Sequence, residues 1–348
     1  MADKPSIIEL LDFTADNDVS DLHISSGLPP MVRMSGDIQR LEAPELTGED
    51  VHKMIKELAN EEQYQTFLEL GDFDMGFQHT KARFRVNLFQ QTRGPGIVCR
   101  TIPTKILSLE ELKAPSSFKV ISQQPRGIVL VTGPTGSGKS TTLAAIINEV
   151  NITRKEHILT VEDPVEFVHQ PQLSLINQRE VGQHTKSFAS SLRAALREDP
   201  DIILVGEMRD PETIGLALTA AETGHLVFGT LHTSSAAKTV DRVIDVFPAG
   251  EQDMIRAMLS ESLRAVISQT LLKKIGGGRV AAHEIMLATP PIRNLIRENK
   301  VPQMYSAIQT GQAMGMQTLD QCMKGLVEQG VLSKEDAKRV AVKKDDFN

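Results

Sequence analysis

Tryptophan is absent from this chain of 348 residues, and only 4% of the residues are aromatic. Its two cysteines, Cys99 and Cys322, lie far apart and neither belongs to a C-x-x-C pair, so the sequence indicates no zinc motif and no disulfide framework. Scarce aromatic side chains leave few platforms on which nucleic-acid bases could stack. A formal net charge of −7 also argues against a protein whose whole surface binds nucleic acid, although it leaves room for a local basic channel.

A signal segment and long apolar runs are missing too. The starting segment MADKPSIIELLDF lacks a basic stretch followed by an apolar core, and apolar runs such as 128–131 and 202–205 have only the length of a strand. We therefore expect a cytoplasmic protein without a membrane span. Apolar residues make up 40% of the chain, which is enough for well-packed cores, and its length predicts two domains.

The stretch GIVLVTGPTGSGKSTT organises the chain. An apolar strand over 128–131 leads into the complete P-loop pattern G-x-x-x-x-G-K-[ST], and a helix is expected to open at Thr141. The glycines allow successive backbone N–H groups to surround an anion, and the helix N-terminus adds unpaired donors. We expect Lys139 to hold the β- and γ-phosphates and the Ser140 hydroxyl to ligate Mg²⁺. The further nucleotide-binding candidates are Gly133, Pro134, Thr135, Gly136, Ser137, Gly138 and Thr141.

Acidic residues follow two of the later expected strands. The segment EDPVE at 162–166 comes after an expected strand over 157–161, and an α/β sheet places its ligand chemistry at such strand ends. A merely charged loop is the alternative. The run 202–205 leads into Gly206 and Glu207 as a Walker B strand does, in which the carboxylate reaches Mg²⁺ directly or through water.

Histidines bracket a further expected strand over 226–231. His225 precedes this strand and His232 follows it. A lone histidine in such a loop is most often structural, so a phosphate contact by His232 and a structural role both stay open from the residues alone.

In the N-terminal part of the chain, the alternation of apolar and polar residues predicts a strand over 82–90. Arg83 and Arg85 would project from the face opposite Phe84, because side chains alternate along a strand. For a lone strand, a solvated outer face is the simpler interpretation of these arginines.

Proline clusters and changes of hydrophobic period divide the chain. We expect four regions, namely an α+β domain over 1–102, an inter-domain linker over 103–125, a nucleotide domain over 126–288 and a helical C-terminal region over 289–348. Within the third region the pattern predicts a long amphipathic helix over 251–275.

Four segments now stand in one order along the chain. They are the P-loop, EDPVEF at 162–167, GEMRD at 206–210 and TGHLVFGTLHT at 223–233. Together they resemble the Walker A, Asp box, Walker B and His box of the type II/IV secretion ATPase superfamily. The segments SDLHISSGLPPMVRMSG, RFRVN and IRNLIRE extend the resemblance over nearly the whole chain and point to the pilus retraction ATPases within that superfamily.

The resemblance implies a fold and a set of residue roles. It implies a homo-hexamer of α/β subunits, each with an N-terminal PAS-like α+β domain, a C-terminal RecA-like P-loop domain that binds ATP, and a helical tail. Glu166 would polarise the attacking water, Glu207 would be the Walker B acid, and Glu162 and Asp163 would help to order the site. Both histidines match the His box, with His232 nearer the γ-phosphate.

The resemblance also changes the interpretation of the arginines. Family arginines that reach the phosphates from the N-terminal domain match Arg85 and Arg100, with Arg83 behind them. An arginine finger would stabilise the charge that develops during phosphoryl transfer, so for Arg85 this role replaces the solvated face.

The function implied by the resemblance is an ATP-driven motor for pilus retraction. It would act on the inner-membrane platform protein from the cytoplasmic face. The further N-terminal domain and the tetracysteine zinc motif, common in assembly and secretion members, are missing, which favours retraction. An accessory retraction ATPase and an assembly or secretion ATPase stay as alternatives. So do a RecA-like nucleic-acid translocase, which the acidic composition disfavours, and a nucleotide switch with slow hydrolysis.

Overall fold

The computed structural model describes residues 4–17, 19–34, 37–102 and 105–348. The chain divides into two compact units. The first, which we call the N-terminal unit, spans residues 1–105 together with the segment 163–168. The second, the P-loop unit, spans 106–162 and 169–348. Each unit has its own sheet and its own hydrophobic core.

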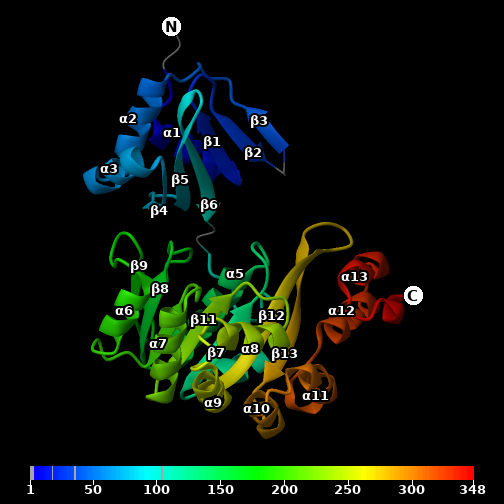
Figure 1. Cartoon of the computed structure of the whole chain (residues 1–348). Helices are drawn as coiled ribbons and strands as arrows, with labels where there is room; N and C mark the ends of the chain where they lie inside the picture. The colour runs from blue at the N-terminus through cyan, green and yellow to red at the C-terminus, as the bar shows by residue number, and fades with distance from the viewer. Residues whose placement is uncertain (1–3, 18, 35–36, 103–104) are drawn as a thin grey trace. The chain divides into compact units, whose positions relative to one another are not determined.

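The N-terminal unit contains an antiparallel sheet with the strand order β3-β2-β1-β6-β5-β4 (Figure 1). Its elements are α1 (Ile7–Asp16), β1 (Asp21–Ser25), β2 (Met31–Met34), β3 (Asp37–Arg40), α2 (Gly48–Leu58), α3 (Glu61–Leu70), β4 (Asp72–Gln78), β5 (Arg83–Gln91) and β6 (Gly94–Ile102). Apolar side chains of the three helices and of the strands share one core. This core includes Cys99, whose side chain is fully buried. Burial raises the pKa of the Cys99 thiol to about 12.

Local capping chemistry fixes the helices of this unit. At the start of α2, the Thr47 hydroxyl accepts a hydrogen bond from the Asp50 backbone N–H, and the Asp50 carboxylate accepts one from the Thr47 backbone N–H. These two bonds form a capping box. Helix α3 ends at Gly71, whose φ of 76° lies in the left-handed region that glycine adopts without strain.

The P-loop unit contains a sheet with the order β13-β12-β7-β11-β10-β8-β9. All neighbouring strands pair in parallel except β13, which runs antiparallel to β12. Its strands are β7 (Gly127–Thr132), β8 (His157–Glu162), β9 (Leu175–Glu180), β10 (Ile202–Val205), β11 (Leu226–Leu231), β12 (Leu263–Lys273) and β13 (Arg279–Leu287). This arrangement confirms the α/β fold class with a P-loop domain.

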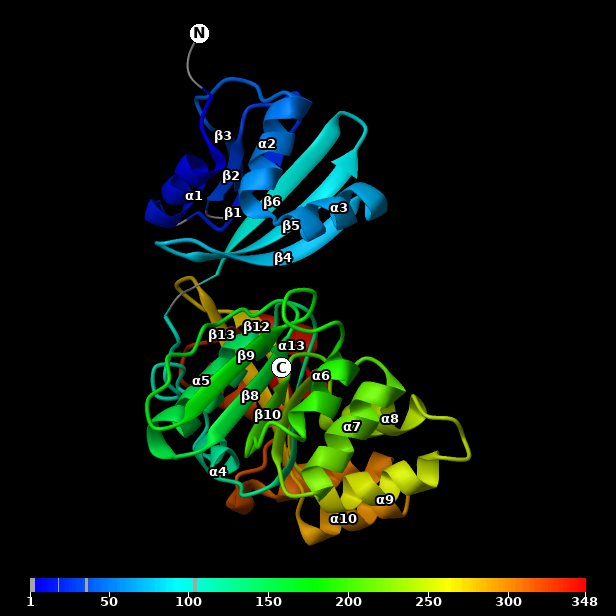
Figure 2. The ribbon, with the colours of Figure 1, turned by 90° about the vertical axis from the view of Figure 1, so that its left-hand side faces the viewer.

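Helices cover both faces of this sheet (Figure 2). They are α4 (Ser117–Ser122), α5 (Lys139–Thr153), α6 (Phe188–Ala195), α7 (Pro211–Glu222), α8 (Ala236–Asp245), α9 (Gln252–Ser262), α10 (Pro290–Arg297) and α11 (Met304–Thr310). Two further helices, α12 (Leu319–Glu328) and α13 (Lys334–Val340), form a separate cluster with residues of β12 and β13. Along β7, Ile128 and Leu130 pack with α6 to α11, whereas Val129 and Val131 pack with α4 and α5. In the described part of the chain, no helix has the length and apolar character that crossing a membrane requires.

The long helix expected over 251–275 is wrong. Helix α9 ends at Ser262, and the chain continues directly as β12, which lies between β7 and β13. The buried side chains Ala265, Val266 and Ile267 are consecutive, as in a strand covered on both faces. Such a short apolar run has no clear period, so the ladder to β7 decides the conformation rather than local propensity.

The segment expected to link the domains is described from residue 105 onward, while 103 and 104 lie outside the described residues. Its side chains Leu109, Phe118 and Ile121 are buried in the same core as α5. The part from residue 106 therefore packs as a piece of the P-loop unit.

Candidate active site

The P-loop lies at the carboxyl end of β7, and α5 begins at Lys139, two residues before the expected start. Gly133 and Gly138 have φ angles of 145° and 86°, which residues with a side chain rarely adopt. A Cβ atom on Gly133 would also come within 2.2 Å of the Gln269 carbonyl oxygen. The glycines of the pattern are thus required by both backbone conformation and packing.

The loop offers the donor set that a triphosphate requires. The Lys139 ammonium reaches back over the loop and donates to the carbonyl oxygens of Gly133 at 2.9 Å and Pro134 at 3.1 Å. The Ser137 hydroxyl is buried and has no hydrogen-bond partner within the described residues. Ser140 and Thr141 stand in the first turn of α5. A cationic amine, a free buried hydroxyl and a helix N-terminus fit a bound phosphate group.

Gln269 supports the P-loop from β12. Its side-chain amide donates to the Ser137 carbonyl oxygen at 2.7 Å, and its amide oxygen accepts from the Thr142 hydroxyl at 2.7 Å. Both contacts are buried. Gln269 lies within the helix expected over 251–275, and a helix there predicts no contact with the loop. The only available signal was the run of buried residues around it.

Glu207 follows β10 and is held by two cationic or basic side chains. The Arg209 guanidinium approaches both carboxylate oxygens, with Nε 2.5 Å from Oε1 and Nη2 2.6 Å from Oε2. His232 Nε2 lies 2.8 Å from Oε1. Burial by itself would raise the pKa of Glu207, but Arg209 and His232 outweigh it and hold that pKa below its usual value. The carboxylate is therefore ionised at neutral pH.

A pocket of about 490 Å³ opens at this strand edge, and Glu207, Arg209, His232 and Arg242 are among its lining residues. The structure thus brings the expected Walker B acid and His232 together. Arg242, from α8, was not expected, because the sequence analysis did not assign that helix.

His225 does not share this edge. It precedes β11, and its backbone carbonyl accepts a hydrogen bond from Gly127, the first residue of β7. Its ring Nδ1 lies 2.9 Å from the Ala220 carbonyl oxygen. In a parallel sheet the two ends of a strand lie at opposite edges, so His225 is at the far edge from the P-loop that follows β7. Within the P-loop unit, His225 and His232 therefore lie at opposite edges of the sheet.

The Asp box begins at the end of β8. Glu162 accepts hydrogen bonds from the Thr160 hydroxyl at 2.6 Å and from the Gln178 amide at 3.2 Å, which fixes its carboxylate. Asp163 and Glu166 belong to the segment that groups with the N-terminal unit. Asp163 is exposed and Glu166 is half-buried.

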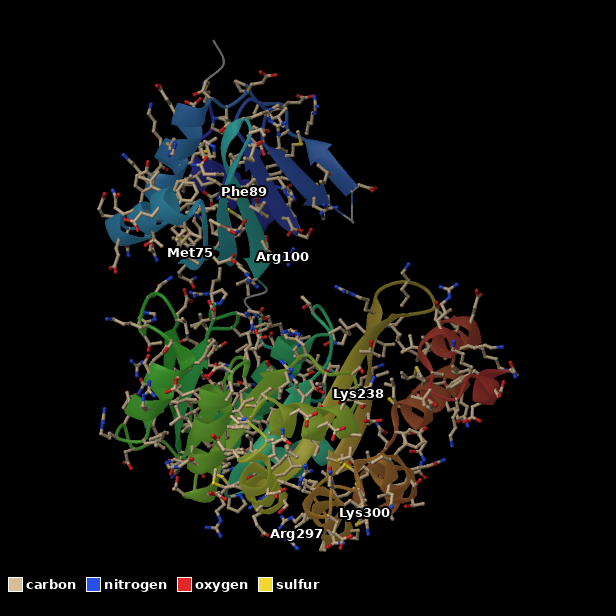
Figure 3. All side chains as sticks on the ribbon, viewed as in Figure 1. Met75, Phe89, Arg100, Lys238, Arg297 and Lys300 are labelled. Carbon is tan, nitrogen blue, oxygen red and sulfur yellow. The ribbon has the colours of Figure 1, made fainter. Side chains whose placement is uncertain are left out.

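Arginines share one face of the N-terminal sheet. Arg85 on β5 lies directly opposite Arg100 on β6, and Arg100 lies opposite Asp21 on β1. Arg100, which is labelled in Figure 3, donates through Nε to Asp21 Oδ1 at 2.8 Å. Arg85 Nε lies 3.8 Å from Asp74 Oδ1. Burial would raise the pKa of Asp21, yet Arg100 outweighs it and lowers that pKa.

Arg83 occupies the same face of β5, two residues from Arg85. Its Nε donates to the Val165 carbonyl oxygen at 2.7 Å. Arg83 therefore binds the backbone of the segment that also carries Glu166, within the N-terminal unit. The contact gives Arg83 a positioning role for this segment.

A mostly parallel sheet with helices on both faces, a P-loop after one strand and an acid after another defines a P-loop ATPase of the RecA-like class. Residues 69–277 match the family model described as type II/IV secretion system protein. The chain belongs to this family, and it is an ATP hydrolase.

Individual relatives cover nearly the whole chain. The type IV pilus retractation ATPase PilT of Pseudomonas aeruginosa is 63% identical over 336 residues, which are 96% of this chain and 98% of the relative. The twitching motility protein of Neisseria gonorrhoeae is 63% identical over 314 residues, 90% of this chain and 84% of the relative. A crystal structure of the pilus retraction motor PilT with bound ADP matches with a TM-score of 0.91, 45% identity and 99% coverage of both chains.

Proposed function

We propose that this chain is a motor that hydrolyses ATP to drive the retraction of type IV pili. The observation that carries the proposal is the 63% identity to a pilus retractation ATPase, which extends over 98% of that relative. The chain would work as a homo-hexamer, peripheral to the cytoplasmic face of the inner membrane. Its partner would be the pilus platform protein, with an accessory retraction ATPase as a further candidate and with no nucleic acid involved.

The proposed mechanism divides the work among residues of the P-loop unit. Lys139 and the backbone N–H groups of 135–141 would bind and orient the β- and γ-phosphates. Ser140 and Glu207 would hold Mg²⁺, which when bound neutralises charge on the phosphates. His232, which already contacts Glu207, would sense the γ-phosphate.

Glu166 is proposed as the general base. It would accept hydrogen bonds from the attacking water and increase the negative charge on its oxygen. Glu162 and Asp163 would order the Asp box, and the two bonds that fix the Glu162 carboxylate support this role.

The N-terminal unit would supply positive charge. Arg85 and Arg100 would stabilise the phosphoryl group in the transition state, while Arg83 holds the backbone of the Glu166 segment. ATP turnover would then move the nucleotide domain, residues 126–288, against the domain 1–102. Of the linker 103–125, the part from residue 106 packs with the P-loop unit and would move with it. This movement would do mechanical work on the platform protein, with the helical region 289–348 as part of the moving body.

Deleting the gene tests the biological role. Cells without a retraction motor are expected to carry many pili that never shorten, whereas bald cells would indicate an assembly ATPase. Unchanged retraction while a second motor is present would indicate an accessory role. ATPase activity stimulated by single-stranded DNA in a salt-sensitive way would instead indicate a translocase.

The substitution Glu166→Gln tests the proposed chemistry. Because Gln cannot accept the proton, ATP should still bind while turnover falls by about 10²- to 10⁴-fold. Binding of a fluorescent ATP analogue and phosphate release measure the two effects separately. Glu222→Gln, an exposed change at the end of α7, is the matched control and should keep full activity. Near-normal hydrolysis by the Glu166 variant would remove the general-base assignment.

A further inference from the structure

The pairing between Arg209 and Glu207 raises a conflict with the proposed role of Glu207. A Walker B acid must present a carboxylate oxygen toward Mg²⁺ or a metal-bound water. Here the Arg209 guanidinium lies 2.5 Å from one oxygen and 2.6 Å from the other. The guanidinium neutralises the carboxylate: Nη2 donates a hydrogen bond to Oε2, whereas the contact of Nε with the buried Oε1 is an ion-pair contact without a hydrogen bond. While the pair is closed, the positive charge of Arg209 at the carboxylate opposes the binding of a second cation there.

The surroundings allow the Arg209 side chain to move while its backbone stays fixed. On one side, Met208 is buried and packs against Gly229 of β11. On the other side, Asp210 caps α7, because its carboxylate accepts from the Thr213 backbone N–H at 2.8 Å. The Arg209 side chain is itself 75% exposed, against 18% for Glu207. Only the guanidinium needs to leave for the pair to open.

His232 can keep the Glu207 carboxylate in place when the pair with Arg209 opens. Its Nε2 lies 2.8 Å from the same Oε1 that Arg209 approaches. When Arg209 leaves, His232 remains as a partner that keeps the carboxylate oriented. Because 75% of the Arg209 side chain is exposed, water can solvate the guanidinium once it leaves, and we take the cost of opening as about tenfold in population.

We propose that Arg209 is a latch on Glu207: a positioning residue that holds the Walker B acid in an inactive pair and must release it before hydrolysis. This inference rests on the proposed role of Glu207 in the ATPase reaction. The latch gives the ring a way to keep a subunit inactive although the P-loop and the acid are both assembled.

The substitution Arg209→Gln tests the latch in the purified full-length protein. Without the guanidinium, basal ATP turnover should rise about three- to tenfold, the inverse of the population cost of opening. Independently of turnover, the Mg²⁺ concentration that half-saturates tight binding of fluorescent ADP should fall by a similar factor. Arg209→Lys keeps the charge but loses the two-pronged guanidinium. Its turnover and its half-saturating Mg²⁺ concentration should therefore lie between those of the wild-type protein and the Gln variant.

Controls separate the latch from other roles of Arg209. Arg193→Gln breaks an exposed ion pair with Glu212 elsewhere on the unit and should change neither value. A fall in turnover for Arg209→Gln at unchanged melting temperature would overturn the latch and make Arg209 catalytic. A large loss of melting temperature, repeated in the Lys variant, would overturn it in favour of a structural role.

One further variant separates failure of the latch from failure of the proposed chemistry. Glu207→Gln should abolish turnover, and adding Arg209→Gln to it should restore none. If Glu207→Gln keeps its activity, the role of Glu207 itself is wrong. If Glu207→Gln is inactive and Arg209→Gln shows no gain, only the latch is wrong.

Discussion

The two sheets of this protein present functional groups in different ways. In the N-terminal sheet, β5 alternates between buried Phe84 and Val86 and half-buried Arg83 and Arg85. In the P-loop sheet, every residue of β7, β10 and β11 is buried. The first sheet can therefore display side chains on an open face, whereas the second can place them only where its strands end.

The two units therefore carry their functional groups at different places in their sheets. The P-loop, Glu207 and His232 all follow the carboxyl ends of strands. The arginine face of the other sheet has an electrostatic cost, since Arg85 and Arg100 stand directly opposite each other. Asp74 and Asp21 offset this cost only in part, because the Arg85 pair is 3.8 Å long. An anionic ligand on this face would remove the remaining repulsion.

Removing an arginine from the face of the N-terminal sheet is expected to have the largest effect on activity. Arg85→Gln or Arg100→Gln should lower kcat by about 10³-fold, the low end of the effect of an arginine finger. The melting temperature should change little, because both side chains are partly exposed. Steady-state phosphate release and thermal unfolding measure the two quantities.

Arg40→Gln provides the control, since Arg40 is exposed on the edge strand β3. Unchanged kcat in both the Arg85 and the Arg100 variants would return this face to a solvated surface. The edge of the P-loop sheet would then carry the chemistry without it.

Gln269→Leu tests whether the edge of the P-loop sheet depends on support from β12. The change leaves the buried Ser137 carbonyl and Thr142 hydroxyl without their partners, at a cost of about 1–3 kcal/mol each. We expect nucleotide affinity to fall about tenfold together with the melting temperature, as measured by fluorescent ATP titration and calorimetry. Gln309→Leu, exposed on α11, is the control. Unchanged affinity would show that the loop holds its conformation alone.

The smallest expected effect concerns pH and the core of the P-loop unit. Burial lowers the pKa of His283, on β13, from 6.5 to about 4. The unfolded chain therefore binds this proton at a higher pH than the folded chain does. The contribution of neutral His283 to the free energy of unfolding is complete above pH 6.5 and is lost as the pH falls toward 4. His283→Leu should reduce the dependence of unfolding free energy on pH by up to about 1.4 kcal/mol per pH unit in this window.

Chemical denaturation at pH 7 and pH 5 checks this expectation through the slope and not the absolute stability of the variant. Parallel pH profiles for the two proteins would contradict it. The His283 ring packs edge-on against Phe118 at 5.1 Å between centroids, so some loss of stability at both pH values is expected.

Local sequence patterns are sufficient for those parts of the fold whose conformation is decided by neighbouring residues. The strand before the P-loop is a short apolar run between turn residues, and the Thr47 capping box satisfies helix donors within four residues. Strand β12 could not be predicted this way, because its conformation depends on pairing with β7 far away in the sequence. Only that pairing brings Gln269 beneath the loop.

The position of a candidate residue in the fold was predictable wherever that position follows from strand order. A residue after a parallel strand reaches the functional edge, which applies to Glu207 and His232 but not to His225. The Arg209 pairing was not predictable, since a side chain two residues beyond Glu207 has many rotamers and its choice depends on local charge.

The burial of the native cysteines has a practical consequence for measuring how this protein works. Cys99 is fully inside the core, with the pKa of its thiol raised to about 12, and burial also raises the pKa of Cys322. Thiol reagents attack the thiolate, so both native sites should label slowly in the folded protein. Single cysteines introduced at exposed positions of each unit could then carry a dye pair without prior removal of the natural cysteines. The distance between the two dyes would report the movement of the N-terminal unit relative to the P-loop unit during ATP turnover.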